Sequence, residues 1–274
     1  TPGEAEATHF ADDLKALGLT AAVFPPRDFM LRPVEGAGRE YEYRRLSVLG
    51  ALAGGRLNAV CVPAEALLQY TVPRDEFLRN TLTLKPGMVY NREALVARLF
   101  AAGYVRRSQV DGPGQFSVRG DIVDIYAPDM HQPARVEYWD DEIDSLRFFS
   151  AETQKSEQNV ETATVIPSHD TFFTDAVRQT LVTRIEGELA ETAARAGEDV
   201  RKQLQERLAH VGEESDAGIL SYYAYLAPEF QATLFDHLPE GALLCVDETE
   251  VVDSALQTKH EAILSQLGDL FTYG

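Results

Sequence analysis

The sequence contains only two cysteines, one tryptophan and no long hydrophobic run among its 274 residues. Crossing a bilayer takes about 18 or more consecutive apolar residues, and the chain's start has neither the basic nor the apolar segment of a signal peptide. These absences argue against a membrane protein. Cys61 and Cys245 each lie in a short apolar run, which predicts two buried thiols rather than a disulfide or a metal site. Free thiols suit a reducing cytoplasm, which is the predicted location.

Basic residues are also scarce, because 44 acidic side chains outnumber 25 lysines and arginines and give a formal net charge of -19. Nonspecific DNA affinity comes largely from Lys and Arg displacing counterions, so this balance argues against a broad phosphate-binding surface. The imbalance is uneven along the chain. Residues 81–155 contain 9 basic and 11 acidic residues, whereas the remainder contains 16 and 33. That segment is electrostatically unlike its surroundings.

Helix and strand patterns alternate near both ends of the chain, which predicts a parallel sheet. The predicted elements are helices over 4–18, 39–55, 64–70 and 249–268, and strands over 21–24, 57–63 and 242–248. A helix over 175–211 is predicted as well, in an acidic and alanine-rich region. The first residues from Thr1 read as the turn and helix that follow a strand, so we expect a fragment of a longer protein.

A different pattern interrupts this alternation. One helix, with Asn91 as its N-cap and Gly103 at its end, precedes several strands that have no helices between them. These strands are predicted at about 104–110, 115–119, 122–126, 134–139 and 143–149. Such an order favours an antiparallel sheet with one covering helix, an inserted α+β domain.

No motif supplies a complete catalytic site. Residues 50–56 have the glycine spacing of a phosphate loop, but Arg56 and Leu57 stand where lysine and Ser/Thr are needed, so a helix end is the better interpretation. The run "LLCVDE" has the apolar strand and acidic pair of the magnesium-binding half of an ATPase site. Asp247 and Glu248 have no phosphate loop to serve in this sequence. We therefore predict no catalytic and no cofactor-binding residue, with this pair as a relic.

Four carboxylates between two predicted strands raise the possibility of a cation site: Asp140, Asp141, Glu142 and Asp144. They lack the glycine and the ligand spacing of a calcium loop, and an exposed turn is the commoner setting for such residues. The six histidines show no ligand spacing such as HExxH. No metal site is predicted.

Strand alternation places the tryptophan on an outward face. In "QFSVR", Phe116 fits the buried face, so Arg119 points away; in "RVEYWD", Val136 fits inside, so Arg135 and Trp139 point outward. One interpretation is an indole covered by a neighbouring loop, with arginines that keep the surface soluble. The other is a protein-binding patch, because Trp and Arg are enriched at interface hot spots and arginines favour a partner with carboxylates.

Several long motifs carry a family resemblance. They are "GYVRRSQVDGPGQFSVRGDIVDIYAP", "PARVEYWDDEIDSLRFFSAETQKS" and "VIPSHD", with support from "FPPRDF", "REYEYRRLSVLGAL" and "DHLPEGALLCVDE". In their order along the chain, these motifs resemble the damage-recognition protein UvrB and, more closely, the bacterial transcription-repair coupling factors (Mfd). The resemblance covers nearly the whole chain and points to the amino-terminal UvrB-like module of that family.

The resemblance implies a fold and a function. The fold is a degenerate, RecA-like helicase domain with a parallel sheet, formed by residues 1–80 and 156–274, with a UvrA-binding α+β domain inserted at 81–155. Such factors recruit UvrA to RNA polymerase stalled at DNA lesions, and this module would be a protein-binding scaffold without ATPase activity. ATP and magnesium would serve the motor modules of the parent protein, whose other modules would contact polymerase and DNA.

The resemblance also assigns site residues. The UvrA-contacting arginine of the family's "VRG" falls on Arg119 and the arginine that opens "RVEYW" falls on Arg135. The family's aromatic residue four positions later falls on Trp139. Phenylalanine is common at that last position, so tryptophan is a departure that keeps the aromatic contact. The alternative function is an ATPase or helicase fragment built around Asp247 and Glu248, with its phosphate loop upstream of Thr1.

Overall fold

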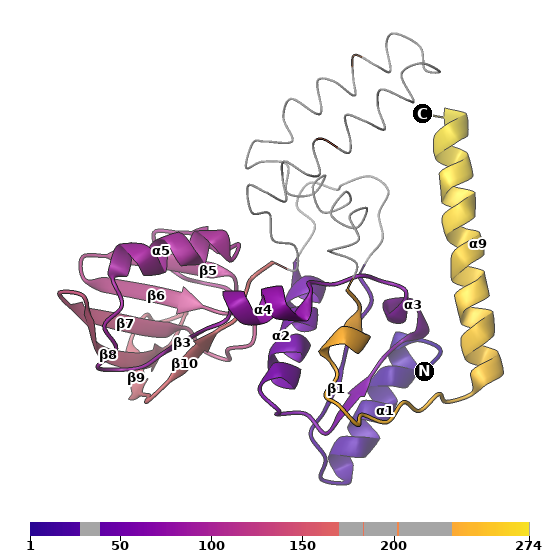
Figure 1. Cartoon of the computed structure of the whole chain (residues 1–274), viewed down its shortest axis with the longest axis horizontal. Helices are drawn as coiled ribbons and strands as arrows, with labels where there is room; N and C mark the ends of the chain where they lie inside the picture. The colour runs from indigo at the N-terminus through magenta and orange to yellow at the C-terminus, as the bar shows by residue number, and fades with distance from the viewer. Residues whose placement is uncertain (28–38, 170–182, 184–201, 203–231, 274) are drawn as a thin grey trace.

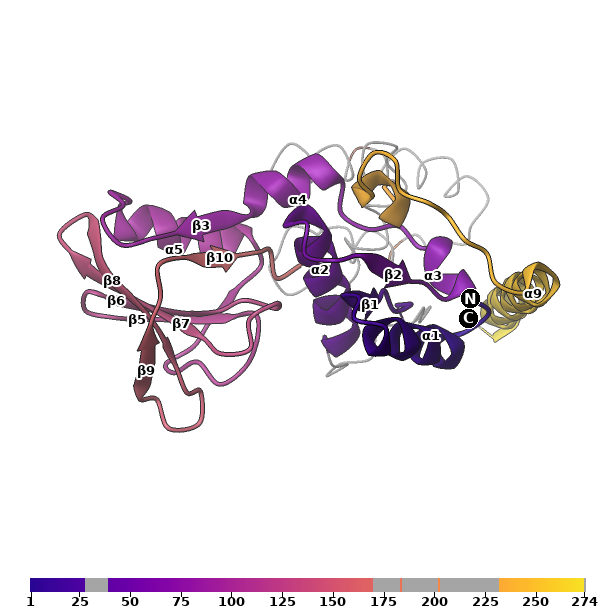
Figure 2. The same ribbon diagram turned by 90° about the horizontal axis from the view of Figure 1, so that it is seen from below.

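The computed structural model describes residues 1–27, 39–169 and 232–273, together with the isolated positions 183 and 202. The protein is mixed α/β, with parallel and antiparallel sheets, as the sequence predicts. A first part holds the amino-terminal helices and a small parallel sheet, and a second part beside it is built on a six-stranded sheet (Figures 1 and 2). The predicted helix over 175–211 lies outside the described residues, apart from positions 183 and 202.

The first part is a small αβαβ unit. Its elements are α1 (Glu4–Ala16), β1 (Ala21–Val23), α2 (Glu40–Ala53), β2 (Ala59–Cys61), α3 (Ala64–Leu67) and α4 (Arg74–Asn80). Strands β1 and β2 pair in parallel, because the helix between them returns the chain to the same edge of the sheet. On α1, Ala7 and Ala11 are fully buried against the sheet beside Cys61. The predicted elements are confirmed here, except that α3 is shorter and α4 was not predicted.

The second part is built on six strands that are neighbours in chain order. They are β4 (Val105–Arg106), β5 (Gln115–Arg119), β6 (Ile122–Tyr126), β7 (Ala134–Trp139), β8 (Glu142–Phe149) and β9 (Ser156–Asn159). All pairs are antiparallel except β4 with β5, which is parallel. The prediction of a purely antiparallel sheet is therefore wrong at this edge, and the polar sequence of β9 gave no strand signal.

Helix α5 (Arg92–Ala101) covers one face of this sheet. The side chain of Asn91 accepts a hydrogen bond from the backbone N–H of Ala94, as expected of an N-cap. Leu95 and Leu99 are buried in the same core as the inward residues of the strands, while Phe100 meets the ring of Phe116 edge-on at 5.0 Å. The opposite face of the sheet has no helix over it in the described part of the chain.

A two-stranded antiparallel ribbon joins the ends of the second part. Its strands are β3 (Leu82–Leu84) and β10 (Ala163–Val165), with Leu84 opposite Ala163. This pairing brings the chain that leaves the sheet back beside the chain that enters it.

Helix α2 fastens the second part to the first. Ser47 Oγ donates a 2.9 Å hydrogen bond to the carbonyl oxygen of Pro128, and Arg56 forms a 2.9 Å ion pair with Asp129. At the start of the same helix, Glu42 lies 3.0 Å from His169 Nδ1. These contacts come from the start and the middle of α2 and from the residues just after it, so this segment fixes the second part at several points.

The segment after η3 (Leu234–His237) departs from the prediction. Residues 242–248 form no strand and cross the surface as irregular chain, with Leu243 93% exposed and Cys245 also exposed. The predicted burial of Cys245 is therefore wrong, whereas that of Cys61 is confirmed. Apolar composition favours a strand, but a strand forms only by pairing with another one, and within the described ranges this segment pairs with neither β1 nor β2. Helix α9 (Thr249–Tyr273) follows, as predicted.

Two helix-ending glycines differ in what surrounds them. Gly18 ends α1 with φ 85° and Gly103 ends α5 with φ 83°, both in the left-handed region. A Cβ at Gly18 would meet nothing within 4 Å, whereas one at Gly103 would lie 2.5 Å from the His169 ring and 2.9 Å from its Cβ.

We expect Gly18→Ala to lower the free energy of unfolding by about 1 kcal/mol through backbone strain. Gly103→Ala should cost about 2–4 kcal/mol, because overpacking adds to the strain. Urea unfolding of the two variants tests this, and equal losses would contradict the described packing of His169.

The pKa of Glu42 predicts a pH dependence of stability. Burial alone would raise this pKa, but the contacts with His169 and Arg39 lower it from 4.5 to about 2. Because the folded pKa is depressed, the stabilisation is complete above about pH 4.5 and is lost as the pH falls towards 2. We expect Glu42→Gln to lower the free energy of unfolding by roughly 3 kcal/mol at pH 7, with the gap to the wild type narrowing below about pH 4.5 and closing only as the pH falls to about 2. A stability difference that does not change with pH would contradict the lowered pKa of Glu42.

Candidate protein-interaction surface

The outer face of the six-stranded sheet presents polar side chains in rows that cross several strands. Strand pairing places Asp124 of β6 between Ser117 of β5 and Arg135 of β7, and Arg147 of β8 continues the row. Residues paired in this way project from the same face of a sheet. Their neighbours in sequence form the apolar face that packs on α5, which explains why these four polar residues lie together.

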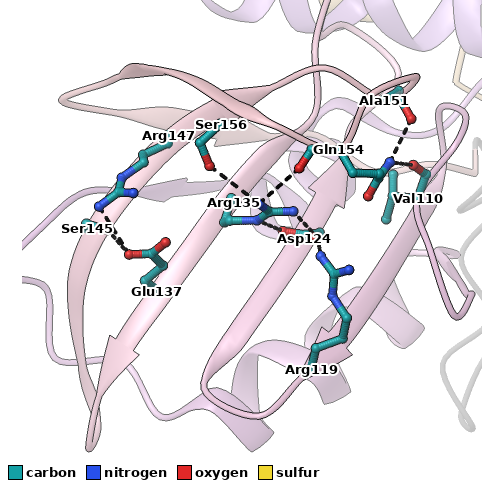
Figure 3. A network of polar contacts seen from close by, with 10 residues as sticks. All are labelled: Val110, Arg119, Asp124, Arg135, Glu137, Ser145, Arg147, Ala151, Gln154 and Ser156. Carbon is teal, nitrogen blue, oxygen red and sulfur yellow. Dashed lines mark hydrogen bonds and ion pairs between the residues drawn. The ribbon is translucent and has the colours of Figure 1, made fainter.

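Asp124 is the centre of this face. Its side chain is fully buried, and it accepts hydrogen bonds from two arginines (Figure 3). Arg135 donates through Nε to Oδ1 at 2.7 Å and through Nη2 to Oδ2 at 2.9 Å, a bidentate arrangement. Arg119 donates through Nη2 to Oδ2 at 2.5 Å. A buried carboxylate is costly unless it is paired and hydrogen-bonded, so the two guanidinium groups are what allow this residue to be inside.

The two arginines are not equivalent. The side chain of Arg135 is only 11% exposed; its guanidinium lies 4.4 Å from the centre of the buried Phe149 ring. Its hydrogen bond with Asp124 raises its pKa further above the usual value. The Arg119 side chain is 45% exposed and contacts Asp124 through one nitrogen. Arg135 is therefore an internal clamp, and Arg119 presents most of its hydrogen-bond donors to solvent.

The turn after Arg119 is held from α5. Arg92, the first residue of that helix, donates to the carbonyl oxygen of Gly120 at 2.7 Å and pairs with Asp121 at 2.9 Å. Gly120 has φ 59°, a conformation that glycine adopts without strain. The end of β5, and with it the base of Arg119, is fixed by the helix on the opposite face.

Trp139 ends β7 and is 80% exposed. Burial alternates along this strand, so that Ala134, Val136 and Tyr138 face the core while Trp139 shares the outer face with Arg135. The four-residue separation places the indole about 13 Å beyond Arg135, at about 3.3 Å per residue. In the described structure the indole is not covered, which decides against the interpretation of a loop-covered tryptophan.

Glu137 lies between these residues on β7. It accepts a 2.7 Å hydrogen bond from Ser145 Oγ and pairs with Arg147 at 3.3 Å (Figure 3). Both partners belong to β8, so the two strands are linked across the outer face as well as by their backbone. This part of the face is close to neutral, and the exposed positive charge lies at Arg119.

The structure brings two of the predicted site residues together and leaves the third apart. Arg119 and Arg135 meet on one carboxylate, and Trp139 lies on the same face further along β7. Sequence reasoning did not identify Asp124, the residue that joins the two arginines.

The acidic pair of the sequence analysis lies apart from this surface. Asp247 and Glu248 are in the exposed irregular segment before α9, with Glu248 at φ 52°. Among the described residues there is no cluster of three side chains able to hold a metal ion and no helix long and apolar enough to cross a membrane.

The comparisons with known proteins match the part of the chain that carries this surface to a recognised domain family. Residues 82–170, which include the whole six-stranded sheet, match the family described as the UvrB interaction domain. Over nearly its whole length, the chain is also similar to transcription-repair-coupling factors. It is 26% identical over 273 residues to that of Bacillus subtilis, a match that covers 96% of this chain. It is 30% identical over 251 residues to that of Staphylococcus epidermidis, a match that covers 89%.

These matches confirm the resemblance to a UvrB-like module of transcription-repair-coupling factors that the sequence motifs indicate. They also set its extent, because the chain spans about a fifth of the length of those relatives, 23% for the Bacillus protein and 21% for the Staphylococcus protein.

The Asp124 pairing predicts unequal effects of substitution on stability. Asp124→Ala leaves Arg135 desolvated beside Phe149 without its carboxylate, and we expect it to lower the free energy of unfolding by about 3–5 kcal/mol. Arg119→Ala removes one exposed partner and should cost about 1 kcal/mol or less. Chemical denaturation of both variants measures the difference. Equal small losses would show that Asp124 is accessible to water rather than buried.

Proposed function

We propose that this chain is the UvrA-docking module of a transcription-repair-coupling factor and that the outer face of the six-stranded sheet is its docking surface. The observation that carries the proposal is the exposure of Trp139, the sequence's only tryptophan, at the end of a strand where it is paired with Glu142. The match of residues 82–170 to a UvrB interaction domain supports it. In this proposal the protein recruits UvrA and has no catalytic residue.

The indole is suited to serve as the interface anchor. Exposing a tryptophan costs free energy that a partner recovers on binding, and tryptophan is among the residues most enriched at interface hot spots. Trp139 is itself paired with Glu142, and Tyr138 before it is paired with Ile143, so its backbone loses little freedom on binding. Little of the binding free energy is then spent on ordering this residue.

The arginines supply charge complementarity. Two guanidinium groups share one carboxylate, so the cluster of Arg119, Arg135 and Asp124 keeps a net positive charge. Arg119 is the member that can reach a partner, and its free donors suit a carboxylate on UvrA. Arg135 takes part by its charge and by holding Asp124, which in turn orients Arg119.

The rest of the chain is a scaffold in this proposal. We infer a degenerate, RecA-like helicase domain formed by residues 1–80 and 156–274, which holds an inserted UvrA-binding domain at 81–155. Strand β9 (Ser156–Asn159), just past that boundary, completes the sheet of the inserted domain. The parallel pairing of β1 with β2 across α2 supports this reading. ATP and magnesium would act in motor modules of the parent protein, and RNA polymerase and DNA would bind its other modules. The chain itself would then not hydrolyse ATP.

Titration of purified UvrA against the 274-residue chain tests the proposal. We expect Trp139→Ala to raise Kd at least about 30-fold, equivalent to about 2 kcal/mol for a central anchor. Arg119→Ala should raise Kd by about fivefold to tenfold, with a smaller effect at high salt.

Phe10→Ala provides a matched control, since Phe10 is an aromatic residue that is 46% exposed on α1, away from the sheet. Its Kd should equal that of the wild type. Unchanged affinity for Trp139→Ala and Arg119→Ala, in chains whose thermal unfolding is normal, would place the docking site elsewhere.

A further inference from the structure

A second exposed apolar residue shares the row of Trp139. Trp139 pairs with Glu142 of β8, and Glu142 in turn pairs with Val89, which belongs to the segment between β3 and α5. The three side chains therefore project from one face, with Val89 about 10 Å from Trp139 at two strand spacings. Val89 is 74% exposed.

The backbone at Val89 is fixed on both sides. The N–H of Tyr90 donates to the carbonyl oxygen of Asp141, and the N–H of Ile143 donates to that of Met88, both at 2.9 Å. The flanking residues Met88 and Tyr90 pack against the core. Val89 is thus held in place two strands from the exposed indole, with Glu142 between them. The row of Trp139, Glu142 and Val89 is a defined strip of the outer face, with an apolar side chain at each end and a carboxylate in the middle.

The charge around this strip is opposite to that at Arg119. Asp140 and Glu142 are exposed carboxylates, and neither has an ion pair within the part of the chain that the structure describes. Asp141 accepts a 2.6 Å hydrogen bond from the side-chain amide of Asn91, which leaves its charge in place. The outer face is thus positive at Arg119 and negative at the end of β7, with the indole between the two.

We propose that the UvrA-docking surface extends along the row of Trp139, Glu142 and Val89, and that UvrA places there an apolar side chain flanked by a lysine or arginine. This inference rests on the proposed function. It adds a requirement, because the partner must carry charges of both signs, a carboxylate towards Arg119 and a cation towards Glu142. A surface with one positive and one negative end fixes the orientation of the bound partner, which a single positive patch does not.

The test is a titration of UvrA against the full chain carrying Val89→Ser, Glu142→Gln or Glu142→Lys. Val89→Ser should raise Kd about fivefold, through loss of apolar contact. Glu142→Lys should raise Kd more than Glu142→Gln, by about tenfold or more at low salt, and this excess should shrink as salt screens the charges. Leu17→Ser and Glu161→Lys are the matched controls. Leu17 is 78% exposed on the first part and Glu161 is an exposed acid beyond β9, so neither should change Kd.

The outcomes separate this inference from the proposed function. If Trp139→Ala weakens binding while Val89→Ser and Glu142→Lys do not, the extension is overturned and the docking surface stands. If Glu142→Lys strengthens binding, the required charge on UvrA is wrong in sign. If none of these three variants changes Kd, the docking surface itself is overturned. Urea unfolding of each variant guards against a loss of affinity through misfolding, and Glu142→Gln keeps the test valid if the lysine variant is unstable.

Discussion

The buried carboxylate of Asp124 is the constraint on which the outer face of the sheet depends. It lies on the central strand of three and is reached from β5 on one side and β7 on the other. Burying it unpaired would cost several kcal/mol, so both guanidinium groups must be present in the right register. The same requirement opposes a one-residue slip of β7, which would turn Arg135 towards the core and Val136 towards water. A polar contact thereby specifies the arrangement that an apolar core alone would leave less certain.

The pairing with Asp124 gives Arg135 and Arg119 different roles. Arg135 is enclosed by Asp124, Phe149 and the chain at Gln154 and Ser156, so it has little to offer a partner directly. Arg119 is held by one hydrogen bond to Asp124, so its guanidinium can also bind a carboxylate of a partner protein. The family resemblance treats both as contact residues, and the structure shows that their physical environments differ. The proposed anchor, Trp139, is independent of the pair and contributes area rather than charge.

Much of the site could be predicted from sequence because strand alternation is a local property. The pattern around Val136 and Tyr138 was enough to place Arg135 and Trp139 outward, and the structure agrees. Alternation does not reveal which residues become neighbours on adjacent strands, so the sequence alone did not single out Asp124. The strand prediction at 242–248 was wrong for a related reason. Its composition suits a strand, but whether it finds a pairing partner depends on residues far away in the sequence. The parallel edge at β4 and the polar strand β9 were missed because neither carries a periodic signal.

The succession of the strands has a consequence for folding kinetics. From β5 to β9 each strand pairs with the next one in the chain, so most contacts of the outer face join residues that are close in sequence. Such low contact order favours rapid formation through successive hairpins. The ribbon of β3 and β10 is different, because it joins residues about 80 positions apart in the chain and must close a long loop. We therefore expect the sheet that carries Arg119 and Trp139 to assemble early, and the closure that brings His169 back to α2 to come late.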